Sequence, residues 1–267
     1  MKIALIQLAY GDAETPADRV ARVVSLVREQ RGHDLVVLPE LWRAGAFDYR
    51  QWPQREDQVD GETTVALAEV AREIGAVLHT GSIVERSPGE AGPEGKGLWN
   101  TSVIVGPNGS VCATYRKIHR FGFGSGEPKL MEAGEDILVT RLPAPADDLT
   151  VGVSTCYDLR FPELYRRQVD QGAEMFLLAS AWPAARISAW RTLLRARAIE
   201  NQCFVVACNT AGTHAGTEMG GHSAVIDPLG EVVAEAGSAE EILSADIDSS
   251  AVATWRSKFP VLDDRRL

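Results

Sequence analysis

The feature that most constrains the fold of this chain is a set of short apolar segments that alternate with stretches of helical character. The segments Asp34–Leu38, Thr150–Ser154 and Glu174–Ala179 are too short for helices and are dominated by apolar residues. Such runs are typical of strands that are buried on both faces. Glu62–Ile74 and Ile187–Asn201 are predicted to be helices. The sequence therefore predicts an α/β protein whose strands lie inside a covering of helices.

The rest of the chain adds strands, helices and two hairpin turns. Further strands are predicted at Lys2–Leu8, Ala76–Val84, Trp99–Val105, Ser110–Tyr115, Cys203–Cys208, His222–Asp227, Glu231–Ala236 and Ile242–Ile247. Further helices are predicted at Ala17–Arg31, Pro162–Gln171 and Ser249–Ser257. The sequences at 106–109 (GPNG) and 228–230 (PLG) are typical of turns between antiparallel strands. Since hairpins do not fit a purely parallel sheet, a layered sandwich with two sheets inside is predicted.

Composition and charge narrow the function classes. The chain has 267 residues, of which 45% are hydrophobic, and a formal net charge of −10. It is therefore long enough for one large domain or two small ones, and we expect a single domain over 1–267 because no linker divides it. The loop-like stretch Ser87–Gly97 is interpreted as a loop tip. The acidic balance argues against nucleic acid as a partner.

Targeting signals also bear on the class of protein. The first residues, MKIALIQLAYGD, do not resemble a signal peptide, and no apolar run approaches the length of a membrane span. The four cysteines, Cys112, Cys156, Cys203 and Cys208, form no CxxC pair. We therefore expect a cytoplasmic protein with reduced cysteines and no membrane partner.

Reactive side chains follow three of the predicted strands. Glu40 comes directly after an apolar strand that ends at Pro39, and Lys117 lies in YRKIH after a hairpin strand. Cys156 stands between a buried strand and a predicted helix, where a helix N-terminus and a cation favour a reactive thiolate. Each residue also has a non-catalytic alternative. Glu40 could be an exposed carboxylate, Lys117 part of a basic surface loop, and Cys156 a small buried side chain.

Other reactive arrangements are not supported. The five histidines form no metal-binding spacing, and we expect neither a metal nor an organic cofactor. His214 and His222 lack an acid two residues later, so a Cys-His-Glu triad is not supported. The glycines at 122, 124 and 126 do not match a phosphate-binding loop.

Taken together, the motifs LPELW, YRKIH and STCYDLRFPELYR resemble those of the nitrilase superfamily of carbon–nitrogen hydrolases. RARAIENQCFVVACN and GHSAVIDPLGEVVAEAG add to the resemblance, which extends over nearly the whole chain. It implies a four-layer α-β-β-α sandwich and a homodimer. The helix that ends near Gln171 commonly lies at the interface of such dimers, and a C-terminal tail at 253–267 is expected to reach across it.

The resemblance implies a role for each catalytic residue. Cys156 would be the nucleophile, Glu40 the general base and Lys117 the cation that stabilises the oxyanion, with the backbone N–H of Tyr157 as a second donor. The family often has a further glutamate in the loop after the lysine. Counting back from Gly134 places it at Glu127, and Glu132 is the alternative.

The resemblance also suggests a substrate class. Arg160 lies where related small-acid amidases and carbamoylases have an arginine associated with a substrate carboxylate, although a salt bridge to Glu163 is an alternative. Trp42, Arg43 and Trp182 are candidate pocket walls or core residues. The predicted activity is thiol-dependent hydrolysis of the terminal amide of a small carboxylate-bearing molecule, through a Cys156 thioester with release of ammonia.

Three other functions remain open at this point. Hydrolysis of N-carbamoyl amino acids and of nitriles uses the same chemistry. The residues after Cys156 resemble those of ω-amidases and deaminated-glutathione amidases more than those of nitrile-cleaving enzymes. A non-catalytic interaction protein on the same scaffold is disfavoured, because Glu40, Lys117 and Cys156 are all present.

Overall fold

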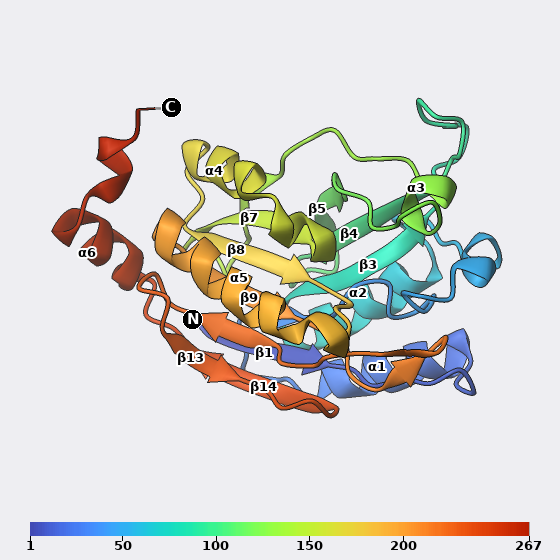
Figure 1. Cartoon of the computed structure of the whole chain (residues 1–267). Helices are drawn as coiled ribbons and strands as arrows, with labels where there is room; N and C mark the ends of the chain where they lie inside the picture. Colours follow the sequence, from blue (N-terminus) through green and yellow to red (C-terminus); the bar gives the residue numbers. More distant parts are fainter. Residues whose placement is uncertain (267) are drawn as a thin grey trace.

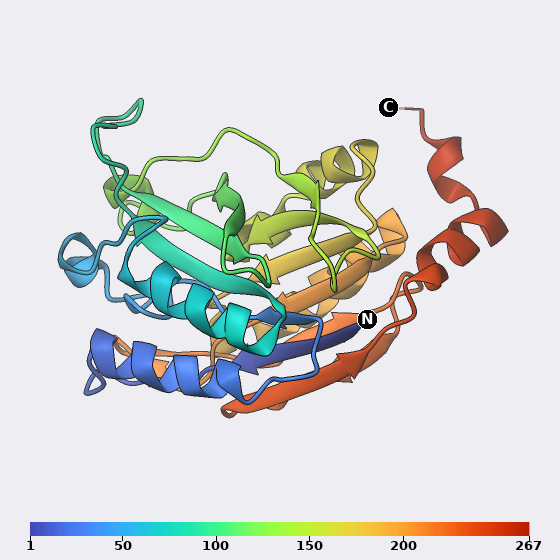
Figure 2. The same cartoon turned by 180° about the vertical axis from the view of Figure 1, so that it is seen from behind.

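In the computed structural model, which describes residues 1–266, two mixed β-sheets pack face to face and helices cover both outer sides (Figures 1 and 2). The strand order is β14-β1-β2-β3-β4-β5 in one sheet and β13-β12-β9-β8-β7-β6 in the other. In each sheet a parallel trio, β1-β2-β3 or β7-β8-β9, is flanked by antiparallel strands. This arrangement confirms the predicted α-β-β-α sandwich.

The elements have the following bounds. The first sheet contains β1 (Lys2–Gln7), β2 (Leu35–Val37), β3 (Val77–Glu85), β4 (Trp99–Val105), β5 (Val111–Arg116) and β14 (Glu241–Asp246). The second contains β6 (Val139–Arg141), β7 (Thr150–Thr155), β8 (Met175–Ala179), β9 (Phe204–Cys208), β12 (Ala224–Ile226) and β13 (Val232–Glu235). A separate small hairpin is formed by β10 (Thr213–His214) and β11 (Thr217–Glu218).

The helices lie on opposite sides of the sandwich. Figure 1 shows α4 and α5 over the second sheet, and Figure 2, from behind, shows α1 and α2 over the first. The α-helices are α1 (Pro16–Arg28), α2 (Glu62–Ile74), α3 (Glu127–Leu130), α4 (Pro162–Asp170), α5 (Ile187–Asn201) and α6 (Ser250–Lys258). Short 3-10 helices are present at Tyr49–Gln54, Cys156–Arg160, Ala184–Arg186 and Val261–Asp264. Within residues 1–266, no helix has the length and apolar character needed to cross a membrane.

The alternation of side chains along the strands explains the layers. In β1, Ile3 and Leu5 pack between the two sheets, whereas Ala4 and Ile6 face α1 and α2. The second sheet repeats this pattern in β8, where Leu177 faces the other sheet and Phe176 faces α4 and α5. Because successive side chains point to opposite faces, a strand covered on both sides must be apolar throughout.

Sequence patterns located most elements well. The helices at Glu62–Ile74 and Ile187–Asn201 and the strand at Trp99–Val105 have the predicted bounds, and the other predicted elements differ by up to three residues at an end. The edge strand β6, the small β10–β11 hairpin and the 3-10 helices were not predicted. These elements are too short for a periodic pattern to distinguish them from loops.

The predicted C-terminal tail begins within α6, and Leu267 lies outside the described residues. The segment projects from one end of the sandwich in both views. It is attached near its middle, where Gln202 Nε2 donates to the carbonyl of Phe259 at 2.7 Å, and near its end, where Arg265 pairs with Asp170 at 2.6 Å. Phe259 is 53% exposed.

We expect Leu177→Ala to lower the free energy of unfolding by about 2–5 kcal/mol, because it leaves a cavity between the sheets. Leu177 is fully buried, whereas Leu229, in the second hairpin turn, is 46% exposed. Leu229→Ala is therefore the matched control and should change the unfolding free energy by no more than about 0.5 kcal/mol. Urea unfolding followed by circular dichroism measures both, and equal effects would contradict the assignment of the core.

Candidate active site

The ends of three strands bring the predicted reactive residues together. Glu40 follows β2, Lys117 follows β5 and Cys156 follows β7. All three line one small cavity, and Glu127 from α3 lines it as well. The parallel strands β2 and β7 belong to different sheets, so the site lies where carboxyl ends of strands from both sheets meet.

Lys117 lies at the centre of this group. Its Nζ donates to Glu40 Oε1 at 2.7 Å and to Glu127 Oε2 at 2.8 Å, and all three side chains are buried. Burial alone would lower the pKa of Lys117, but the charges of Glu127 and Glu40 outweigh it and hold the pKa well above its usual value. The lysine is therefore a fixed ammonium between two carboxyl groups.

Asn100 in β4 is hydrogen-bonded to both glutamates. Its Nδ2 donates to Glu40 Oε1 at 2.8 Å and to Glu127 Oε1 at 2.6 Å. Burial and the charge of Glu40 raise the pKa of Glu127, whereas Lys117 and Asn100 oppose that rise. Sequence analysis missed Asn100. The available signal was its polar amide within a strand, WNTSVIV, that is buried throughout.

The second carboxylate oxygen of Glu40 is held by the opposite sheet. The backbone N–H of Ala181, just after β8, donates to Glu40 Oε2 at 3.0 Å. The N–H of Glu40 donates in turn to the carbonyl of Ser180 at 3.3 Å. The carboxylate is thus tied to both sheets and cannot move independently of the sandwich.

Cys156 occupies a strained turn between β7 and the following 3-10 helix. It has a φ of +46°, in the left-handed region that residues with a Cβ rarely adopt. Burial and the charge of Glu40 raise the pKa of its thiol, and Lys117 and the N–H of Ala181 only partly oppose this. The thiol is therefore protonated at neutral pH and needs an adjacent base to become a nucleophile.

Asp158 fixes the turn that carries Cys156. Its Oδ2 accepts from the N–H of Thr155 at 2.9 Å and from the Tyr115 hydroxyl at 2.8 Å, and its Oδ1 accepts from the N–H of His119 at 2.9 Å. These bonds connect the turn that carries Cys156 to Tyr115 and His119, which precede and follow Lys117 in the chain. Sequence analysis did not single out Asp158, because its partners Tyr115 and His119 lie about 40 positions away.

Aromatic and basic side chains form the outer part of the site. A second small hollow shares four lining residues with the first: Phe47, Phe121, Cys156 and Ala181. It adds Tyr157, Arg160, Trp182, Pro183 and Arg186. The guanidinium of Arg160 lies 4.8 Å from the ring centre of Trp182. No salt bridge joins Arg160 to Glu163 within residues 1–266.

Two of the candidate pocket residues lie elsewhere, which corrects the sequence-based expectation. Trp42 is fully buried in the core beneath α1 and α2, and its Nε1 donates to the carbonyl of Thr80 at 2.9 Å. It fits there because β3 has a glycine at position 81, where a Cβ would approach the indole to 2.9 Å. Arg43 instead donates to the carbonyl of Arg55 at 2.9 Å. Phe47, Tyr49, Trp52 and Phe121 line the cavity in their place.

The structure also separates the two candidate glutamates in the loop after the lysine. Glu127 bonds to Lys117, as described above. Glu132 accepts from the backbone N–H groups of Glu94 at 3.0 Å and Lys96 at 2.6 Å. Its carboxylate therefore anchors the loop between β3 and β4. It forms no ion pair with Lys117 within residues 1–266.

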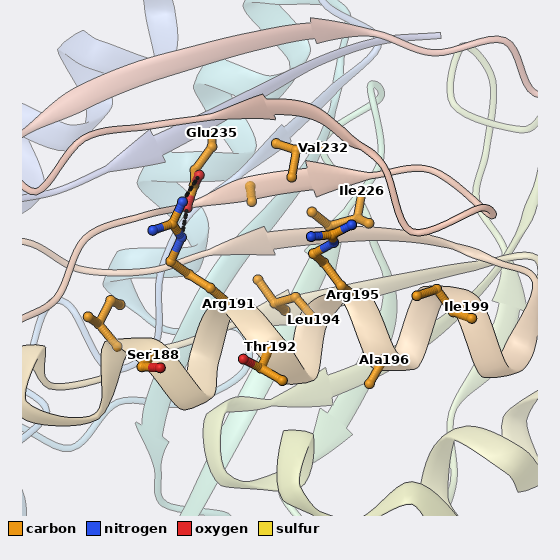
Figure 3. A pocket seen from close by; sticks show the side chains of 12 residues that line it. Ser188, Arg191, Thr192, Leu194, Arg195, Ala196, Ile199, Ile226, Val232 and Glu235 are labelled. Atoms are coloured by element: carbon orange, nitrogen blue, oxygen red, sulfur yellow. Dashed lines mark hydrogen bonds and ion pairs between the residues drawn. The ribbon is translucent and has the colours of Figure 1, made fainter.

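A wide hollow lies away from this site. It has a volume of about 640 Å³ and lies between α5 and the strands β12 and β13 (Figure 3). Two arginines line it: Arg191 is paired with Glu235 at 2.7 Å, and Arg195 lies 4.0 Å from Glu231. This hollow shares no lining residue with the two cavities at Cys156, and it contains neither a thiol nor an unpaired carboxylate. Its size alone does not make it an active site.

A protonated thiol, an adjacent carboxylate and a fixed ammonium define a hydrolase that acts through a cysteine. Comparisons with known proteins agree with this class of enzyme. The carbon-nitrogen hydrolase family matches residues 2–257. A 2-oxoglutaramate amidase of Paenarthrobacter nicotinovorans is 44% identical over 266 residues, which is 100% of this chain and 90% of that protein.

A mammalian relative and a solved structure extend the match. Omega-amidase NIT2 of Homo sapiens is 33% identical over 275 residues, covering 99% of this chain and 95% of that protein. The structure of XC1258 from Xanthomonas campestris, a CN-hydrolase superfamily protein, has a TM-score of 0.88 and 33% identity, with coverage of 100% and 97%. The chain belongs to the carbon–nitrogen hydrolase family, and the predicted thiol-dependent hydrolysis of amides is confirmed.

We expect Asn100→Ala to lower kcat/KM for amide hydrolysis by roughly 10- to 100-fold, because it removes a donor shared by two buried carboxylates. Ammonia release measures the rate. Asn108→Ala in the exposed 106–109 turn is the control and should leave the rate unchanged. If Asn100→Ala keeps the wild-type rate with an intact fold, the bridge between Glu40 and Glu127 has no part in the reaction.

Proposed function

We propose that the protein hydrolyses the terminal amide of a small dicarboxylic acid monoamide, with 2-oxoglutaramate as the first candidate substrate. The observation that carries this proposal is the guanidinium of Arg160, which lines the same cavity as Cys156 and forms no ion pair within residues 1–266. An unpaired guanidinium beside a nucleophile suits a substrate carboxylate. Trp182 holds this guanidinium on its ring. The activities named for the two relatives agree with this substrate class.

In the first half of the reaction, Glu40 takes the proton of the Cys156 thiol as the sulfur attacks the amide carbon. The carbonyl oxygen becomes an oxyanion, which the Lys117 ammonium and the backbone N–H of Tyr157 stabilise. Tyr157 lies in the first turn of a 3-10 helix, where N–H groups have no acceptor within the helix. Protonated Glu40 then donates its proton to the leaving nitrogen. Ammonia departs and a thioester remains on Cys156.

In the second half, a water molecule attacks the thioester while Glu40 takes its proton. The oxyanion forms again at the same two donors and collapses, which expels the Cys156 sulfur. The sulfur recovers the proton from Glu40, and the carboxylic acid product loses its own proton to solvent. One base thus serves both halves, as covalent catalysis through a thioester requires.

Glu127 has the role of a positioning residue in this proposal. It holds the Lys117 ammonium through both carboxylate oxygens, at 3.0 and 2.8 Å. A lysine paired with Glu40 alone would be free to turn away from the oxyanion. Two carboxyl groups on opposite sides of the ammonium keep it at the position where negative charge develops.

We expect the wild-type protein to release ammonia from 2-oxoglutaramate, glutaramate and succinamate, and more slowly from pentanamide, which has no carboxylate. Cys156→Ala should lower the rate by roughly 10⁴-fold or more, because it removes the nucleophile. Cys112→Ala, which alters a cysteine outside the site, is the matched control and should be fully active. N-carbamoyl-β-alanine and an aliphatic nitrile complete the panel. Preference for either of these two would replace the amidase proposal.

We also propose that the protein is a homodimer in the cytoplasm. The C-terminal segment supports the dimer, because it projects from the sandwich and exposes Phe259 and Val261. All four cysteines are free, which suits a reducing compartment. Light scattering at micromolar concentration should give twice the mass of one chain. Deletion of residues 259–267 should weaken the association, and a wild-type mass of one chain would contradict the dimer.

A further inference from the structure

A second guanidinium lies in the cavity of the nucleophile. Arg186, at the end of the 3-10 helix Ala184–Arg186, lines the same hollow as Cys156 and Arg160. Like Arg160, it forms no ion pair with a carboxylate of residues 1–266. The sequence motifs do not single it out, and the mechanism above does not use it.

The two arginines are held on aromatic side chains. The Arg160 guanidinium lies 4.8 Å from the ring centre of Trp182, and the Arg186 guanidinium lies 5.2 Å from that of Phe121. Trp182 also fixes the main chain of Arg186, because its Nε1 donates to the Arg186 carbonyl at 2.9 Å. Rings of this kind orient a guanidinium and leave its edge free for hydrogen bonds to a ligand.

Arg186 is exposed at the mouth of this hollow and is not paired with a carboxylate of the described residues, although the protein has 37 acidic and only 27 basic residues. Arg191, five residues after Arg186, is by contrast paired with Glu235 at 2.7 Å (Figure 3). Two unpaired guanidiniums in one cavity therefore point to oxygen acceptors that a ligand supplies.

We propose that Arg186 is a specificity-determining residue that binds the 2-oxo oxygen next to the substrate carboxylate, while Arg160 binds the carboxylate itself. One carboxylate occupies the fork of one guanidinium, and a second guanidinium needs another acceptor close by. The carbonyl of a 2-oxo acid supplies that acceptor on the adjacent carbon. The inference rests on the proposed function and narrows its substrate class to ω-amides of 2-oxo dicarboxylic acids.

The test compares two substrates that differ only in the 2-oxo group, 2-oxoglutaramate and glutaramate. We expect Arg186→Gln to lower kcat/KM for 2-oxoglutaramate by about tenfold more than for glutaramate, because it removes one charge-assisted hydrogen bond. Arg186→Lys keeps the charge and should recover part of the preference. Arg191→Gln is the matched control on the neighbouring helix and should leave the ratio of the two rates unchanged.

A binding measurement gives a second readout that does not depend on turnover. In a Cys156→Ala background, calorimetry with the products 2-oxoglutarate and glutarate should show the same selective loss when Arg186→Gln is added. Equal losses for both compounds would overturn the assignment of the 2-oxo oxygen, and unchanged values would show that Arg186 does not contact the substrate. In both cases the amidase proposal stands. If the wild-type protein hydrolyses neither of the two amides, the proposed function itself is overturned.

Discussion

The Lys117 ammonium held between Glu40 and Glu127 is the interaction on which the site depends. Burying three charged groups together costs desolvation energy. The attraction and hydrogen bonds among Lys117, Glu40 and Glu127 offset this cost only while each group keeps its partners. Loss of one partner from such a group costs about 3–5 kcal/mol because a buried charge remains uncompensated. Glu40 follows β2, Lys117 follows β5 and Glu127 begins α3, so these ion pairs form only when all three elements are in place. The site therefore assembles together with the sandwich.

Burial and the charges of this group together determine the protonation states that the proposed reaction needs. The pKa of Lys117 is raised, so the cation persists wherever the carboxylates do. The pKa of the Cys156 thiol is raised as well, which keeps the sulfur neutral until a substrate is present. A buried thiol next to carboxylates is a poor thiolate at rest. The proposed proton transfer to Glu40 during attack solves this problem, because no free thiolate has to exist in the empty site.

Much of the fold and the reactive triad could be predicted from the sequence. Apolar segments located the central strands, and Glu40, Lys117 and Cys156 stood out because each follows a strand. Asn100 and Asp158 could not be identified in this way. Their roles depend on partners more than 25 positions away, which only the packing of the two sheets brings close. The choice between a pocket wall and the core for Trp42 could not be made for a similar reason, because the direction of its side chain depends on the space that a glycine at position 81 leaves in a neighbouring strand.

The proposed function requires an acidic protein to attract an anionic substrate. A net charge of −10 repels anions at long range, but salt screens such repulsion beyond about 8 Å at physiological ionic strength. In the proposed function, Arg160 and Arg186 attract the carboxylate end of the substrate at short range, each beside an aromatic ring of the cavity. Charges at such short range are screened less by salt than distant ones. The proposal therefore places selection by charge in the cavity, at the end of the substrate remote from the amide that Cys156 attacks.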